Sequence, residues 1–85
     1  MIEETRLLLH TRDPIGTRRV AEPRLQEFTK QWRFGSATRH TVADGTVPVQ
    51  VLEYIVQLKK KVTPEELVAV MRTACSPQVL DVELV

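Results

Sequence analysis

The chain begins with a strand-like apolar pattern. The run Leu7-Leu8-Leu9 lies within residues 6–10, is too short for a helix and is followed by turn-forming residues. A short apolar run between such breakers is typical of a buried strand. We therefore predict a strand at residues 6–10 and a loop at residues 13–19.

The period of the apolar residues then changes to that of a helix. Leu25, Phe28 and Trp32 recur at i, i+3 and i+7, which stacks side chains on one helical face. Pro23 fits a helix only near its first turn, where its missing N–H is not needed. This pattern predicts a helix over about residues 22–31.

Two extended segments follow, at residues 33–41 and 49–59, with the turn signal Ala43-Asp44-Gly45 between them. The second is the most clearly patterned segment of the chain. One parity carries four large apolar residues, whereas the other parity is mixed, as in a strand with one buried face. The apolar set is Leu52, Tyr54, Val56 and Leu58.

The last third of the chain predicts a helix and a closing strand. Thr63, Pro64 and Glu66 suit the N-cap, N1 and N3 positions of a helix, and its apolar stripe is Leu67, Val70, Met71 and Ala74. Ser76-Pro77 ends that helix. Residues 79–85 alternate, with Leu80, Val82 and Leu84 predicted to face inward and Asp81 and Glu83 outward.

The element order β-α-β-β-α-β predicts an α+β, ferredoxin-like (ACT-like) sandwich as a single domain over residues 1–85. We expect a four-stranded antiparallel sheet with both helices on one face. Right-handed crossovers place the first and third strands in the centre and the second and fourth at the edges.

The composition of the chain excludes several kinds of functional site. The chain has 85 residues, a net charge of +1 and one cysteine, which excludes an intramolecular disulfide framework. Cys75 falls at a helix C-terminus, where the dipole does not favour a thiolate. His10 and His40 lack a metal-ligand spacing and are interpreted as solvated strand-end residues. We therefore predict no enzyme, no catalytic residue, no metal site and no cofactor.

Two segments are candidate binding surfaces. The first is a candidate anion or ligand loop formed by Gly16, Thr17, Arg18 and Arg19, just ahead of a helix. A flexible surface loop is the alternative interpretation. RNA binding by such a sheet requires outward-facing aromatic residues, and Tyr54 has the parity of the buried set. The basic run Lys59-Lys60-Lys61 is interpreted as a solvated lead-in to the second helix, or as a patch facing a charged partner or a bilayer.

The second candidate surface is the sheet face that the helices leave open. Apolar residues of the opposite parity gather there, which is typical of an interface, although β-branched strand propensity alone is the alternative explanation. The candidate interface residues are Val47, Val49, Val51 and Ile55.

The segments 52–60, 62–67 and 79–84 resemble the C-terminal domains of bacterial inner-membrane proteins of the MgtC/SapB type and related uncharacterised families. The resemblance implies an ACT-like cytosolic tail of a larger membrane protein, with membrane contact only through segments outside this chain. The ACT ligand loop is matched only loosely by Asp13-Pro14-Ile15-Gly16.

We therefore predict a non-catalytic regulatory or oligomerisation module in the cytoplasm, which associates with a second copy or with another part of its own chain through the open sheet face. An ACT-type sensor of an amino acid or ion is the first alternative. An RNA-binding module is the second.

Overall fold

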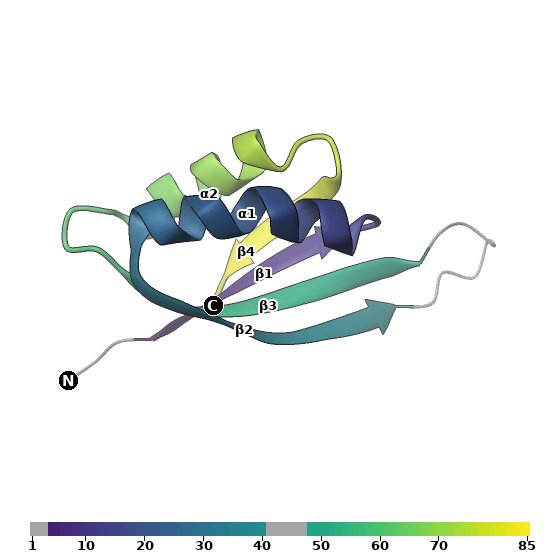
Figure 1. Cartoon of the computed structure of the whole chain (residues 1–85), viewed down its shortest axis with the longest axis horizontal. Helices are drawn as coiled ribbons and strands as arrows, with labels where there is room; N and C mark the ends of the chain where they lie inside the picture. The colour runs from purple at the N-terminus through teal and green to yellow at the C-terminus, as the bar shows by residue number, and fades with distance from the viewer. Residues whose placement is uncertain (1–3, 41–47) are drawn as a thin grey trace.

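In the computed structural model, which describes residues 4–40 and 48–85, the sheet is four-stranded with the order β2-β3-β1-β4, and all neighbouring strands are antiparallel. Both helices lie on the same side of this sheet (Figure 1). This confirms the predicted ferredoxin-like α+β fold with the first and third strands in the centre. The elements are β1 (Thr5–Thr11), α1 (Pro14–Phe28), β2 (Thr29–His40), β3 (Val49–Leu58), α2 (Pro64–Ala74) and β4 (Val79–Leu84).

The hydrophobic core lies between the sheet and the two helices. Strand β3 contributes Leu52, Tyr54 and Val56, each at most 1% exposed, so its predicted parity is confirmed. Leu58, the fourth member of that set, is partly buried and packs against the core. The remaining fully buried apolar residues come from β1, both helices and β4: Leu7, Leu9, Ala21, Leu25, Leu67, Met71, Cys75 and Val82.

Helix α1 begins eight residues earlier than predicted and ends sooner, which corrects the interpretation of residues 13–19 as a loop. Asp13 is its N-cap and accepts a hydrogen bond from the Gly16 amide at 3.1 Å, while Pro14 occupies the first turn. Pro23 therefore lies inside the helix and not in its first turn.

The end of α1 also differs from the prediction. Thr29 is the C-cap, and its hydroxyl donates to the Leu25 carbonyl. Trp32 consequently belongs to β2, where it pairs with Val56 and packs against the core from the sheet. The helical spacing that included Trp32 in the sequence thus crosses an element boundary.

Helix α2 begins as its sequence signature predicts, but Val68 packs against the core in place of the predicted Val70. Thr63 is the N-cap, and its side-chain oxygen accepts from the Glu66 amide at 3.1 Å. Leu67 and Met71 are its fully buried residues. Among the described residues, neither helix is long and apolar enough to cross a membrane.

Strand β4 contains the main correction to the predicted parity. Leu80 was expected to face inward but is 52% exposed. The register between β1 and β4 shifts between His10 and Thr11, so that Val79 pairs with Thr11 while Asp81 pairs with His10. Leu80 is the extra residue of this irregularity, and Val79 packs against the core in its place.

Strand β2 covers the predicted segment 33–41 as far as His40 and starts earlier, directly after α1. Its register against β3 shifts between Phe34 and Ser36. A Cβ atom on Gly35 would lie 2.7 Å from Oε1 of Glu53 and 3.2 Å from its carbonyl oxygen, so the strands approach closely there. The predicted turn Ala43-Asp44-Gly45 and the candidate interface residue Val47 lie outside the described residues.

Candidate functional site on the open sheet face

The sheet surface opposite the helices, called the open face below, carries an apolar centre on the two middle strands. Leu8 of β1 and Val49, Val51 and Ile55 of β3 alternate with the buried core residues and are partly exposed. The three candidate interface residues that the structure describes thus share one surface. Whether a partner covers that surface remains a prediction.

Charged residues of both signs cross this face in two neighbouring rows. Arg6 and Arg33 are the register partners of Ile55 and form, with it, the cationic row. Glu53 and Glu83 are the partners of Leu8 and form, with it, the anionic row. Nε of Arg6 lies 3.7 Å from Oε2 of Glu53, which links the two rows.

The aromatic residues lie on the other side of the sheet. Phe28, Trp32, Phe34 and Tyr54 account for every Phe, Trp and Tyr of the sequence, and all four belong to or pack against the core. The open face therefore offers no Phe, Tyr or Trp on which nucleic-acid bases could stack.

On the helix side, Tyr54 anchors a polar contact between β3 and α1. Its hydroxyl donates to Oε2 of Glu22 at 2.8 Å, and Nε of Arg18 donates to the same oxygen at 2.8 Å. The Arg18 guanidinium also lies 4.1 Å from the ring centroid of Phe34. Burial, followed by the hydrogen bond to the Glu22 carboxylate, raises the pKa of Tyr54 far above its ordinary range.

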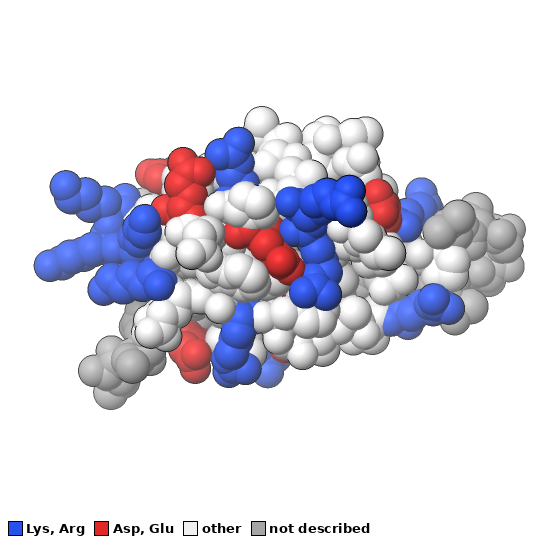
Figure 2. Space-filling view, in the orientation of Figure 1, with Lys and Arg blue, Asp and Glu red and all other residues white. Residues whose placement is uncertain are grey.

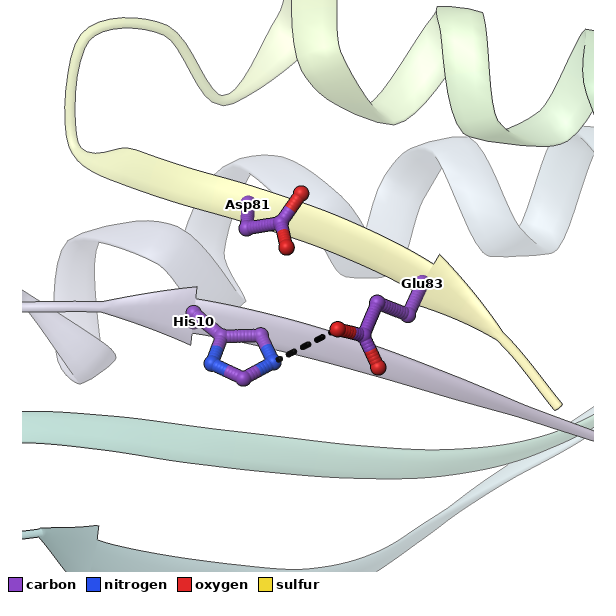
Figure 3. Close-up of side chains that lie close together, drawn as sticks. All are labelled: His10, Asp81 and Glu83. Atoms are coloured by element: carbon purple, nitrogen blue, oxygen red, sulfur yellow. Dashed lines mark ion pairs between the residues drawn. The ribbon is translucent and has the colours of Figure 1, made fainter.

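The structure brings together a histidine and two carboxylates that the sequence analysis did not connect. His10 of β1 lies beside Asp81 and Glu83 of β4, and one donor atom from each lies within 4.8 Å of the others (Figure 3). His10 is not a solvated strand-end residue, because its side chain is only 28% exposed and its strand continues to Thr11. The alternation of residues 79–85 in the sequence predicts that both carboxylates lie on one face of their strand. Only the pairing of the first and last strands in the structure brings His10 next to them.

The residues of the candidate anion loop belong to α1. The backbone amide of Gly16 donates to the Asp13 carboxylate, which already occupies the start of the helix with a negative charge. Thr17 is 1% exposed and its hydroxyl is hydrogen-bonded to that of Thr11 at 2.8 Å. Arg18 pairs with Glu22, and Arg19 is exposed. The four residues thus form part of a capped helix and not a loop.

Cys75 is the C-cap of α2 and is 1% exposed. Burial raises the pKa of its thiol. Because the thiolate is the nucleophilic form, this environment makes Cys75 less reactive than an exposed thiol.

Basic side chains gather at one end of the molecule, where the turn between β3 and α2 lies (Figure 2). Lys59, Lys60 and Lys61 are exposed there, and Nζ of Lys59 donates to the Glu27 carbonyl at 2.7 Å. This hydrogen bond connects the lysine run to the end of α1. The lysine run lies at the opposite end of the sheet from the histidine–carboxylate cluster.

Comparison with protein-family models, with curated proteins and with solved structures gave no match for this chain. The functional interpretation therefore rests on the open face and on the histidine–carboxylate cluster.

Proposed function

We propose that this chain is a non-catalytic oligomerisation module whose open sheet face packs against the same face of a second copy. The supporting observation is the combination of a partly exposed apolar centre with two neighbouring rows of opposite charge, on the face opposite both helices of the described structure. An apolar surface of this kind is typical of an interface.

The charge arrangement favours a second copy as the partner. A two-fold interface is self-complementary, so a surface must carry features that match its own image. A two-fold axis that crosses the strands between the two rows lays each cationic row over the partner's anionic row. Arg6 and Arg33 of one copy then meet the row that contains Glu53 and Glu83 of the other.

The size of the face indicates a weak dimer. Four strands spaced by about 4.8 Å and the seven residues of β1, at about 3.3 Å each, give a face of roughly 440 Å². Stable interfaces bury about 800 Å² per partner. We therefore expect reversible association that depends on protein concentration and weakens with salt, because the charged rows are solvent-accessible.

Sedimentation equilibrium on the wild-type protein and two matched variants tests this proposal. Ile55→Glu introduces a carboxylate between Arg6 and Arg33, which compensate its charge within one molecule, and places it opposite the partner's anionic row. Ile15→Glu makes the same change on α1, where Ile15 is 74% exposed and remote from the open face. The far-UV circular dichroism spectrum and thermal midpoint of each variant check the fold.

We expect a monomer–dimer equilibrium for the wild type and for Ile15→Glu, and a monomer for folded Ile55→Glu. A wild-type protein that stays monomeric at millimolar concentration overturns the proposal. Loss of the dimer in Ile15→Glu but not in Ile55→Glu also overturns it, since the interface would then lie on the helix side.

The resemblance to MgtC/SapB-type tails extends this proposal to a regulatory role at the cytosolic face of a bacterial inner membrane. In that setting, self-association of the module would bring two membrane proteins together. The full-length gene tests this extension, which requires that it encode hydrophobic segments next to this chain. The alternative role of an ion sensor is supported by the cluster of His10, Asp81 and Glu83.

A further inference from the structure

From this cluster we propose a binding site for a divalent transition-metal ion, with Zn²⁺ as the best-suited ion, formed by His10, Asp81 and Glu83 on the open face (Figure 3). The proposal does not depend on self-association, because all three ligands come from one copy of the chain.

The sheet fixes the positions from which the three side chains project. His10 and Asp81 are direct register partners on β1 and β4, while Glu83 pairs with Leu8 and is the diagonal neighbour of His10. Side chains at such positions lie within reach of one another on the same face. The site is therefore held by strand pairing between distant parts of the chain and not by a flexible loop.

The histidine nitrogen that faces the carboxylates has no other partner in the described structure. Nε2 of His10 is buried and makes no hydrogen bond. Its nearest charged neighbour is Oε1 of Glu83, at 3.7 Å, which is too long for a hydrogen bond. Most buried polar atoms have a partner, and a coordinated cation would provide one for this nitrogen.

The distances within the cluster suit coordination after small side-chain rotations. Tetrahedral zinc with ligands at about 2.0–2.1 Å places its donor atoms roughly 3.4 Å apart. The donor atoms here lie within 4.8 Å of one another, with one pair at 3.7 Å. Both carboxylate side chains are about half exposed, so they have room to rotate toward the shorter separation while the strands stay in place.

The donor set selects the type of ion. One imidazole nitrogen with two carboxylates favours zinc and similar transition metals over Mg²⁺ and Ca²⁺, which prefer oxygen ligands alone. Two carboxylates also balance the charge of a divalent ion beside a neutral imidazole. Three protein ligands leave a fourth position for water or for a ligand from a partner.

The neighbours of Asp81 orient its carboxylate and also limit the affinity of the site for a metal ion. Its Oδ1 accepts from the Val82 amide at 2.9 Å, which orients the carboxylate. Nη2 of Arg72 lies 3.7 Å from the same oxygen and competes as a cation. Because the cluster is partly open to solvent and Arg72 competes for Asp81, we expect a dissociation constant in the micromolar range.

Titration of untagged, metal-free protein with Zn²⁺ in a calorimeter, and with Co²⁺ followed by visible absorbance, tests the site. The key variants are His10→Asn and Glu83→Gln, the second of which keeps the shape of an exposed side chain. Their matched controls are His40→Asn, which removes the other histidine of the sequence, and Glu65→Gln, which changes an exposed carboxylate on α2.

We expect one Zn²⁺ per chain, intense tetrahedral Co²⁺ bands, and a loss of affinity of about tenfold or more in both key variants but in neither control. Ile55→Glu, the variant designed to be monomeric, should bind zinc like the wild type. Absence of both signals in the wild type overturns the proposal, as does wild-type binding by folded His10→Asn or Glu83→Gln.

Discussion

The buried hydroxyl of Tyr54 provides the sharpest test of how α1 is held on the sheet. Tyr54 is 0% exposed, and its ring packs edge-on against Trp32 and Phe34 at centroid distances of 5.8 and 5.4 Å. Tyr54→Phe keeps these ring contacts and removes only the 2.8 Å hydrogen bond to Glu22. The change therefore isolates one polar contact between β3 and the helix.

A hydrogen bond to a charged group contributes about 1.5–3 kcal/mol to folding. Glu22 keeps its contact with Arg18 in the variant, so the cost lies near the lower end of that range. With a urea m-value of about 1 kcal/mol/M for a small domain, we expect the denaturation midpoint of Tyr54→Phe to fall by roughly 1.5 M.

The same residue predicts a specific loss of stability at alkaline pH. Burial and the Glu22 carboxylate raise the pKa of Tyr54 in the folded state above its ordinary value of 10.0. Between pH 10 and the raised pKa, Tyr54 ionises in the unfolded chain but stays protonated in the folded one. The stability contributed by the protonated phenol is therefore lost as the pH rises above 10. Tyr54 is the only tyrosine of the sequence, so near-ultraviolet phenolate absorbance reports on it alone.

We expect phenolate absorbance in the wild type to appear only with alkaline unfolding, and the stability of Tyr54→Phe to fall less steeply above pH 10. A double-mutant cycle with Glu22→Gln measures the coupling of the two side chains. An unchanged urea midpoint in Tyr54→Phe, full additivity in the cycle, or titration of Tyr54 near pH 10 in the folded protein would refute the reasoning.

Three further predictions concern the helix caps and the thiol. Thr63→Ala removes the acceptor for the Glu66 amide and should reduce the free energy of unfolding by about 0.5–2 kcal/mol, measured by urea denaturation with an unchanged m-value. Asp13→Ala should cost a similar amount by the same measurement, because Asp13 caps α1; an effect near zero would contradict a helix start at Pro14. Cys75 should react with a thiol reagent at neutral pH much more slowly than a free thiol, since burial shields it and raises its pKa; wild-type labelling as fast as that of the unfolded chain would contradict its burial.

Local signals in the sequence determined the most regular parts of this protein. The period-two pattern of β3 identified Leu52, Tyr54 and Val56 as core, because a one-residue slip would expose the whole set. The start of α2 at Thr63-Pro64 was also predictable, because the N-cap contact is local: Thr63 lies three residues from the Glu66 amide that it accepts from. The order of these elements then sufficed to predict the fold.

Helix α1 was predicted poorly because its buried face is not strongly apolar. Its buried residues are Thr17, Ala21 and Leu25, of which only the last is a large hydrophobic residue. Thr17 is buried because its hydroxyl meets that of Thr11 on β1, a contact that hydropathy does not encode.

The candidate metal site depends on tertiary structure for a more basic reason. His10 and Asp81 become neighbours only when β1 and β4 pair, and this regular register ends directly beyond them, at the irregularity that contains Leu80. Sequence alternation assigns each side chain to a face of its own strand, but it does not fix which residue of a distant strand lies opposite. That choice follows from the packing of the whole sheet, since hydrogen-bond register and core filling are satisfied together only in the folded chain.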